Sequence, residues 1–140
     1  MRSPGVALIT VTISVVAAGC GRGVERARAE RSEVVGDYVY SAAGTTASVP
    51  WALRADLFLH DDSTYELIVG LRVKDEDSRE TDDGAYVVVG DRLRLVPSGD
   101  AHGPHELRVR GDSLILDTDW IAAVGLRLVG MPRPVLVRGR

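Results

Sequence analysis

Cysteine is almost absent from this sequence, and lysine and phenylalanine are as scarce. Cys20 is the one cysteine, so no disulfide bond can form within the chain. Positive charge comes almost entirely from arginine, with Lys74 the one lysine, and the formal net charge is -3. A nucleic-acid-binding domain selects a basic face. The arginines here are scattered and outnumbered by acidic residues, which excludes that class of function.

Long apolar runs are also missing, apart from one at the start of the chain. Residues 5–19 are apolar or small, but they are fewer than the about 20 residues that a membrane-spanning helix needs. Arg2 lies before this run, and Ala17, Ala18 and Gly19 end it. A positive end, an apolar core and small residues are the three parts of an export signal. We therefore assign residues 1–19 to a signal peptide.

Cys20 directly follows these small residues, and the arrangement resembles the lipobox of bacterial lipoproteins. The resemblance implies that the thiol is acylated and that Cys20 becomes the first residue of the mature protein. Acylation also accounts for a lone thiol on an exported chain, and several acyl chains give a stable membrane anchor. Gly21 follows where aspartate would retain a lipoprotein in the inner membrane, which points to the outer membrane in a two-membrane bacterium. An ordinary secretory signal is the alternative.

The polar residues 20–32 have no apolar face, and we expect the acylated cysteine and a flexible tether there. From residue 33 onward apolar and polar side chains alternate, which predicts strands with one buried face. The expected strands are 35–40, 53–60, 65–74, 85–89, 92–96, 106–109, 113–117, 124–129 and 134–137. The sequence therefore predicts one all-β domain at 33–140. Its form is an antiparallel up-and-down β-barrel, or a barrel-like sandwich, of about eight short strands.

Two stretches break the alternation, and we expect both to be loops. Residues 41–50 are small, and residues 75–83 are strongly acidic. Acidic hairpin tips are usually solvated, and a calcium site is the alternative. Gly90-Asp91 and Gly111-Asp112 suit two-residue turns between strands.

The order of motifs resembles the small lipocalin-like barrels of bacterial lipoproteins, and in particular the N-terminal domain of NlpE-type copper-resistance lipoproteins. The motifs that carry the resemblance are Gly36-Asp37-Tyr38, Asp61-Asp62-Ser63-Thr64-Tyr65, Gly84-Ala85-Tyr86 and Gly90-Asp91-Arg92-Leu93-Arg94-Leu95. The resemblance implies a barrel fold and a place in the cell envelope. The family carries a C-x-x-C pair after its first strand, and this chain has none, so copper binding through such a pair is not implied.

The interior of a barrel is the first place to expect a ligand. Eight strands enclose a space that is either filled by side chains or able to hold one small molecule. We expect Trp51 and Trp120 near a rim, and we take them with Tyr65 and Tyr86 as candidate residues for binding an apolar ligand. A packed interior is the alternative, in which the barrel meets an envelope protein through its edge or loops.

A metal site is a further hypothesis. His102 and His105 lie three residues apart near Asp100, and imidazole with carboxylate suits zinc or copper. The surrounding proline and glycine residues are also typical of a solvated loop.

Catalysis has little support, because no nucleophile elbow and no glycine-rich phosphate loop before a helix is present. We expect a protein without enzymatic activity or cofactor. It is held on the envelope membrane by its lipid and binds a small apolar ligand or an envelope partner.

Overall fold

A computed structural model of the protein describes residues 26, 30–99, 103–116 and 134–140. Within them the chain forms eight strands: β1 (Gly36–Thr46), β2 (Val49–Leu59), β3 (Thr64–Val73), β4 (Glu76–Val89), β5 (Arg92–Pro97), β6 (His105–Arg110), β7 (Ser113–Leu116) and β8 (Val135–Arg138). Each strand pairs antiparallel with the next, and β8 pairs with β1, so the sheet closes. The predicted all-β, up-and-down barrel is confirmed. The strand expected at 124–129 lies outside the described residues.

The inner face of the sheet carries the core, as the period-two alternation predicted. From Leu53 to Leu59 every second residue of β2 is buried, and parts of β3, β5, β6 and β7 show the same alternation. Leucine dominates the core, which comprises Val34, Tyr38, Leu53, Ala55, Leu57, Leu59, Tyr65, Leu67, Val69, Tyr86, Leu93, Leu95, Leu107, Leu114, Leu116 and Leu136. One continuous apolar core therefore holds the described strands together.

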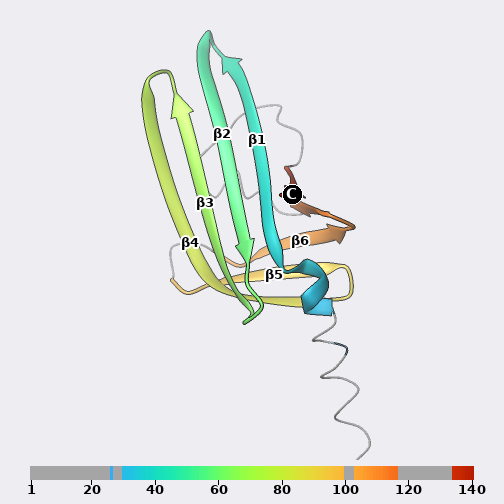
Figure 1. Ribbon diagram of the computed structural model, residues 1–140. Helices are drawn as coiled ribbons and strands as arrows, with labels where there is room; N and C mark the ends of the chain where they lie inside the picture. Colours follow the sequence, from blue (N-terminus) through green and yellow to red (C-terminus); the bar gives the residue numbers. More distant parts are fainter. Residues whose placement is uncertain (1–25, 27–29, 100–102, 117–133) are drawn as a thin grey trace, which may run out of the picture.

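Three strands, β1, β2 and β4, are longer than the sequence predicted, whereas β3 has the predicted length. Figure 1 shows β1 to β4 side by side, extending well past the shorter β5 and β6. The acidic segment 75–83, expected as a loop, forms most of the first half of β4 and pairs with β3 from Val73↔Glu76 to Glu66↔Asp83. The loop prediction is wrong. Glu76, Ser78 and Glu80 lie on the inner face of the strand but stay exposed, so this strand has no buried apolar face that the sequence could reveal. Backbone pairing with β3 maintains this stretch, and no hydrophobic pattern marks it.

The expected loop at 41–50 is also strand. β1 continues to Thr46, a turn at Ala47 and Ser48 follows with positive φ at both residues, and β2 begins at Val49. Positive φ at both central positions is the geometry of a tight hairpin turn. The prediction failed because the small residues of 41–46 resemble a loop in composition. The two Gly-Asp hairpin turns are present as expected, with φ +60° at Gly90 and φ +57° at Gly111.

A short helix closes one end of the barrel. Residues 30–34 are helical, and Val34 is buried in the core. Arg31 donates a 2.7 Å hydrogen bond to the Ser63 hydroxyl in the turn between β2 and β3. The helix lies beside the start of β1 (Figure 1). Part of the segment expected as a tether thus contacts the barrel.

At Gly84, β4 passes from its pairing with β3 into its pairing with β5. A Cβ atom at this position would lie 2.1 Å from the carbonyl oxygen of Val96 and 2.9 Å from the Cα of Pro97. Two backbones therefore approach more closely at Gly84 than any side chain allows. Gly70, in the middle of β3, is the opposite case, because a Cβ there would meet no atom within 4 Å.

This contrast makes a matched pair of substitutions. We expect Gly84→Ala to lower the free energy of unfolding by about 1–3 kcal/mol, because the new methyl group must displace backbone. Gly70→Ala should raise it by about 0.5–1 kcal/mol, because glycine weakens a strand. Urea unfolding followed by circular dichroism measures both. Equal effects of the two substitutions would contradict the close packing at Gly84.

Candidate functional site

The interior of the described barrel is filled by its own side chains. A cavity between these side chains measures about 10 Å³ and is lined by Leu57, Leu67, Leu95, His105, Leu107, Leu116 and Leu136. Such a volume is at the lower limit for a single water molecule. This cavity is too small for the apolar ligand that the sequence suggested.

Tyr65 and Tyr86, expected to contact a ligand, use their hydroxyl groups inside the protein. The Tyr65 hydroxyl donates a 2.8 Å hydrogen bond to Oδ2 of Asp82 across the β3–β4 pair. The Tyr86 hydroxyl donates to the carbonyl oxygen of His60 at 2.5 Å. Both rings are buried. Burial raises the pKa of each hydroxyl, and at Tyr65 the bond to the Asp82 carboxylate raises the pKa further.

Trp51 packs on its own hairpin. Its indole covers Gly44 on the neighbouring strand, where a Cβ would lie 2.8 Å from the ring atom Cζ2. The indole Nε1 donates to the Thr46 hydroxyl at 3.1 Å. A large ring over a cross-strand glycine is a known way to stabilise a hairpin. These contacts give Trp51 a structural role near the tip of the β1–β2 hairpin.

The expected metal ligands are only partly described. His105 is buried, at 5% exposure, and lies among the leucines that line the small interior cavity. Asp100 and His102 lie outside the described residues, as do Trp120 and the anchor residue Cys20. In the part of the chain that the structure covers, no three histidine, cysteine or acidic side chains come close enough together to hold a metal ion. The 75–83 segment, as a strand, does not form the loop on which the calcium alternative depended.

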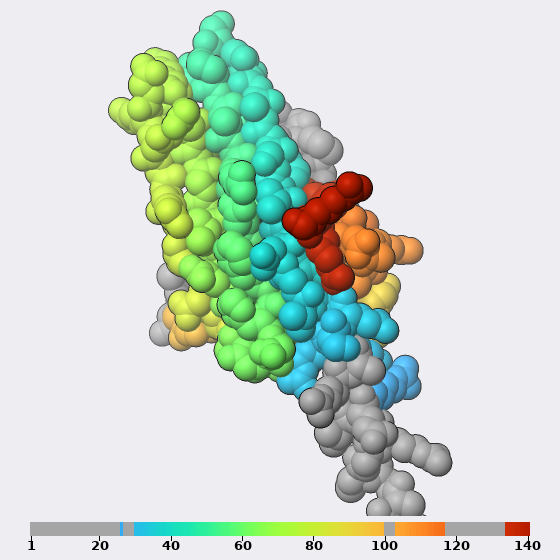
Figure 2. Space-filling model, viewed as in Figure 1, coloured from blue at the N-terminus to red at the C-terminus, as the bar shows by residue number. Residues whose placement is uncertain are grey.

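An open hollow lies on the four long strands of the described chain. It measures about 810 Å³, within the range of small-molecule sites. Most of its lining side chains lie on the outer face of the sheet, away from the core. Gly70 lies at the centre of these residues, because it pairs with Arg54 on one side and with Arg79 on the other. Figure 2 shows the long strands as a continuous surface beside β8. We call this hollow the Gly70 hollow and define it by Arg54, Phe58, Ile68, Gly70, Arg72 and Arg79.

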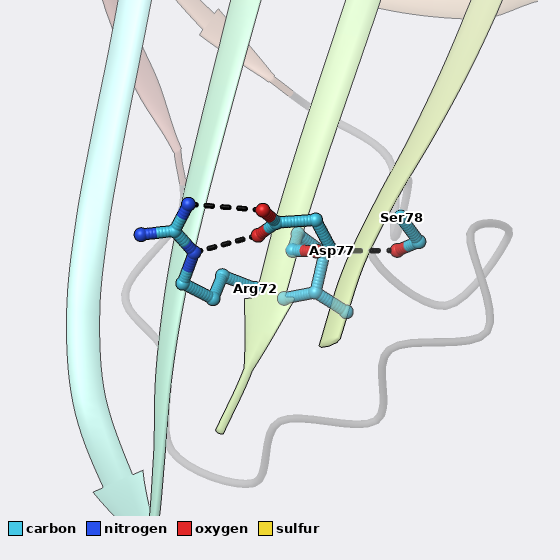
Figure 3. Close-up of polar contacts among 4 residues, drawn as sticks. Arg72, Asp77 and Ser78 are labelled. Atoms are coloured by element: carbon cyan, nitrogen blue, oxygen red, sulfur yellow. Dashed lines mark hydrogen bonds and ion pairs between the residues drawn. The ribbon is translucent and has the colours of Figure 1, made fainter. Parts of the chain in front are cut away.

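Two arginine–carboxylate pairs line the Gly70 hollow. Arg72 binds Asp77 on the neighbouring strand through two hydrogen bonds, Nε to Oδ1 at 2.6 Å and NH2 to Oδ2 at 2.9 Å (Figure 3). Arg54 binds Asp56 in the same two-point manner, with both bonds at 2.8 Å. The Arg72 bonds lower the pKa of the Asp77 carboxyl below its ordinary value. Each guanidinium charge is thus balanced by a carboxylate, and the two-point bonding orients the guanidinium plane.

Arg79 is different from these two arginines. It lines the same hollow from β4, directly opposite Gly70 in the register. Among the described residues it makes no hydrogen bond or ion pair. The sequence analysis missed this site because it placed Arg79 in a loop, so its register with Arg54 and Gly70 was not available. The glycine at position 70, inside a clear strand pattern, was the one signal present.

Comparison with known proteins adds no relative. No protein-family model matches the chain, and no curated protein is similar enough to it to be counted as a relative. The fold itself defines the class, a small closed antiparallel β-barrel, which is compatible with a lipocalin-like binding fold. No helix among the described residues is long and apolar enough to span a membrane.

The bond between Tyr65 and Asp82 can be tested by removing one hydroxyl. We expect Tyr65→Phe to lower the free energy of unfolding at pH 7 by about 1–2 kcal/mol, because a part-buried hydrogen bond to a carboxylate is lost. Tyr40→Phe is the matched control, since the Tyr40 hydroxyl has no hydrogen bond among the described residues. It should change stability by less than about 0.5 kcal/mol.

We also expect the effect of Tyr65→Phe on the free energy of unfolding to depend on pH. Because the folded state raises the pKa of Tyr65 above its ordinary value of 10.0, the unfolded chain loses the proton first. The stability that Tyr65 contributes is complete below pH 10 and falls as the pH rises above it. The difference between wild type and Tyr65→Phe should therefore shrink from pH 9 to pH 11 in urea unfolding. A constant difference across that range would contradict the assignment.

Proposed function

We propose that this protein is a lipid-anchored, non-enzymatic binding module of the bacterial cell envelope that binds its ligand or partner on the outside of a filled barrel. One observation carries the proposal: the cavity among the core leucines measures about 10 Å³, against about 810 Å³ in the Gly70 hollow, which is open to solvent. Binding on the outer face is consistent with the envelope role that the sequence suggested, but the binding site then lies outside the core.

The anchor in this proposal rests on the sequence. Cys20 follows an apolar run and three small residues, which supports acylation and the resemblance to lipocalin-like lipoproteins. The short helix at 30–34 contacts the barrel through Arg31 and Val34. About nine residues therefore separate Cys20 from the folded body, which at about 3.3 Å per residue reach at most about 30 Å. The barrel would remain close to the membrane surface.

The filled interior can be tested with benzene. Leu107 lines the small cavity and is 2% exposed, so Leu107→Ala should open a cavity and cost about 2–5 kcal/mol. Benzene should raise the Tm of Leu107→Ala by filling that cavity, and should leave the wild-type Tm unchanged. A rise in the wild-type Tm equal to that of the variant would show an interior open to ligands, and would overturn the proposal.

The anchor is tested by fractionation and mass spectrometry in a bacterial host. We expect the wild-type protein in the membrane fraction, with an N-terminal peptide that begins at Cys20 and carries the added mass of a diacylglyceryl group. Cys20→Ser should be lost from that fraction, while Ser41→Ala, a change of similar size on the barrel, should remain in it. An unmodified Cys20, or a Cys20→Ser protein still fully bound to the membrane, would contradict the anchor.

A further inference from the structure

Gly70 has no structural reason to be a glycine. Gly44 is covered by Trp51, and Gly84 is pressed against the backbone of β5. At Gly70 the backbone has no positive φ, and a Cβ would meet nothing within 4 Å. Glycine in the middle of a strand lowers stability and often marks a place where another molecule approaches the backbone. The chain therefore keeps open space at the centre of the long sheet without any gain in packing.

The walls of this space are flat and partly apolar. Ile68 on β3 and Phe58 on β2 are half-buried and are diagonal neighbours on the outer face, since Ile68 pairs with Asp56 and Phe58 pairs with Glu66. Arg72 closes the opposite side and is held in a fixed plane by Asp77. A planar guanidinium group whose orientation is already set stacks well on an aromatic ring. The floor and walls thus suit a flat aromatic body.

The Gly70 hollow is lined by one more arginine than carboxylates, so it carries one excess positive charge. Arg54 and Arg72 are each paired with a carboxylate, while Arg79 is not paired within the described residues. Arg54 and Arg79 are the direct cross-strand neighbours of Gly70, each about 5 Å away between Cβ positions. A ligand lying on Gly70 therefore comes within reach of a free guanidinium group, which binds carboxylates in two-point geometry.

The geometry points to a binding site for a small aromatic carboxylate in the Gly70 hollow. The aromatic body lies on the Gly70 backbone between Ile68 and the Arg72 guanidinium plane, and the carboxylate accepts hydrogen bonds from Arg79. This inference rests on the proposed function and adds the class of ligand. The inference can be wrong while the proposed function is right, because a lipid-anchored protein with a filled barrel can still lack this site.

The test uses the full mature chain in nonionic detergent micelles with isoleucine methyl groups labelled for NMR. The probe is 2-naphthoate, and 2-naphthalenemethanol and 2-naphthylmethylammonium are its neutral and cationic analogues. Ile68 reports on the Gly70 hollow, and Ile115 on β7 serves as the internal control. We expect 2-naphthoate to shift the Ile68 methyl signal in a saturable way and to bind about tenfold more tightly than the neutral analogue. The Ile115 signal should not follow it.

Three variants separate the site from general attraction of anions. Arg79→Gln should weaken 2-naphthoate binding about tenfold and leave the neutral analogue unchanged. Arg94→Gln removes another exposed arginine, one on β5 that does not line the Gly70 hollow, and should change neither. Gly70→Val fills the floor with a residue that strands favour, and should abolish binding of both probes without loss of stability.

Three results would overturn the inference. In the first, 2-naphthoate does not shift Ile68, or binds no more tightly than the other two probes. In the second, Arg79→Gln and Arg94→Gln weaken binding equally, which is expected of an unspecific charge effect. In the third, the Gly70→Val protein, still folded by circular dichroism, binds as well as the wild type.

Discussion

Closure of the sheet between β1 and β8 is the constraint on which the rest of this structure depends. Within the described residues, two pairs make this contact, Tyr38↔Arg138 and Val39↔Val137. Arg138 strengthens it, because its guanidinium lies 5.3 Å from the Tyr38 ring centroid and donates to the Tyr38 hydroxyl and to the Glu33 carbonyl. Tyr38 in turn donates to the carbonyl of Val34. One cluster therefore joins the first strand, the last strand and the helix, and the leucine core lies inside the sheet that it closes.

The sequence predicted the parts of the fold where one face of a strand is buried. Along β2 and the first half of β3 the alternation is clear, because inner residues such as Leu57 and Leu67 enter the core. The prediction of strands failed for residues 41–46 and 76–83. In both stretches the long strands extend past β5, and both faces of β4 are polar there. Backbone pairing forms a sheet there without a hydrophobic pattern, and composition alone then resembles a loop. The Gly-Asp turns were predictable because their backbone geometry favours those residues.

The candidate site depends on register, which the sequence does not supply. Arg54, Gly70 and Arg79 come from three strands and meet in one row only because β2, β3 and β4 pair as they do. The residues that composition singled out have other roles. Tyr65 and Tyr86 satisfy their hydroxyl groups inside the protein, and Trp51 covers Gly44. The sequence analysis chose these aromatic residues as ligand candidates because few are present. In a small barrel, however, large aromatic side chains mainly pack against the protein itself.

The position of a bound ligand tests this account most directly. In an intermolecular nuclear Overhauser experiment with 2-naphthoate and methyl-labelled isoleucine and leucine, the aromatic protons should contact the Ile68 methyl group on the outer face. They should show no contact with Leu57 or Leu107, which line the interior cavity of about 10 Å³. Contacts to those leucines, or none to Ile68, would contradict a filled barrel that binds its ligand on the outside.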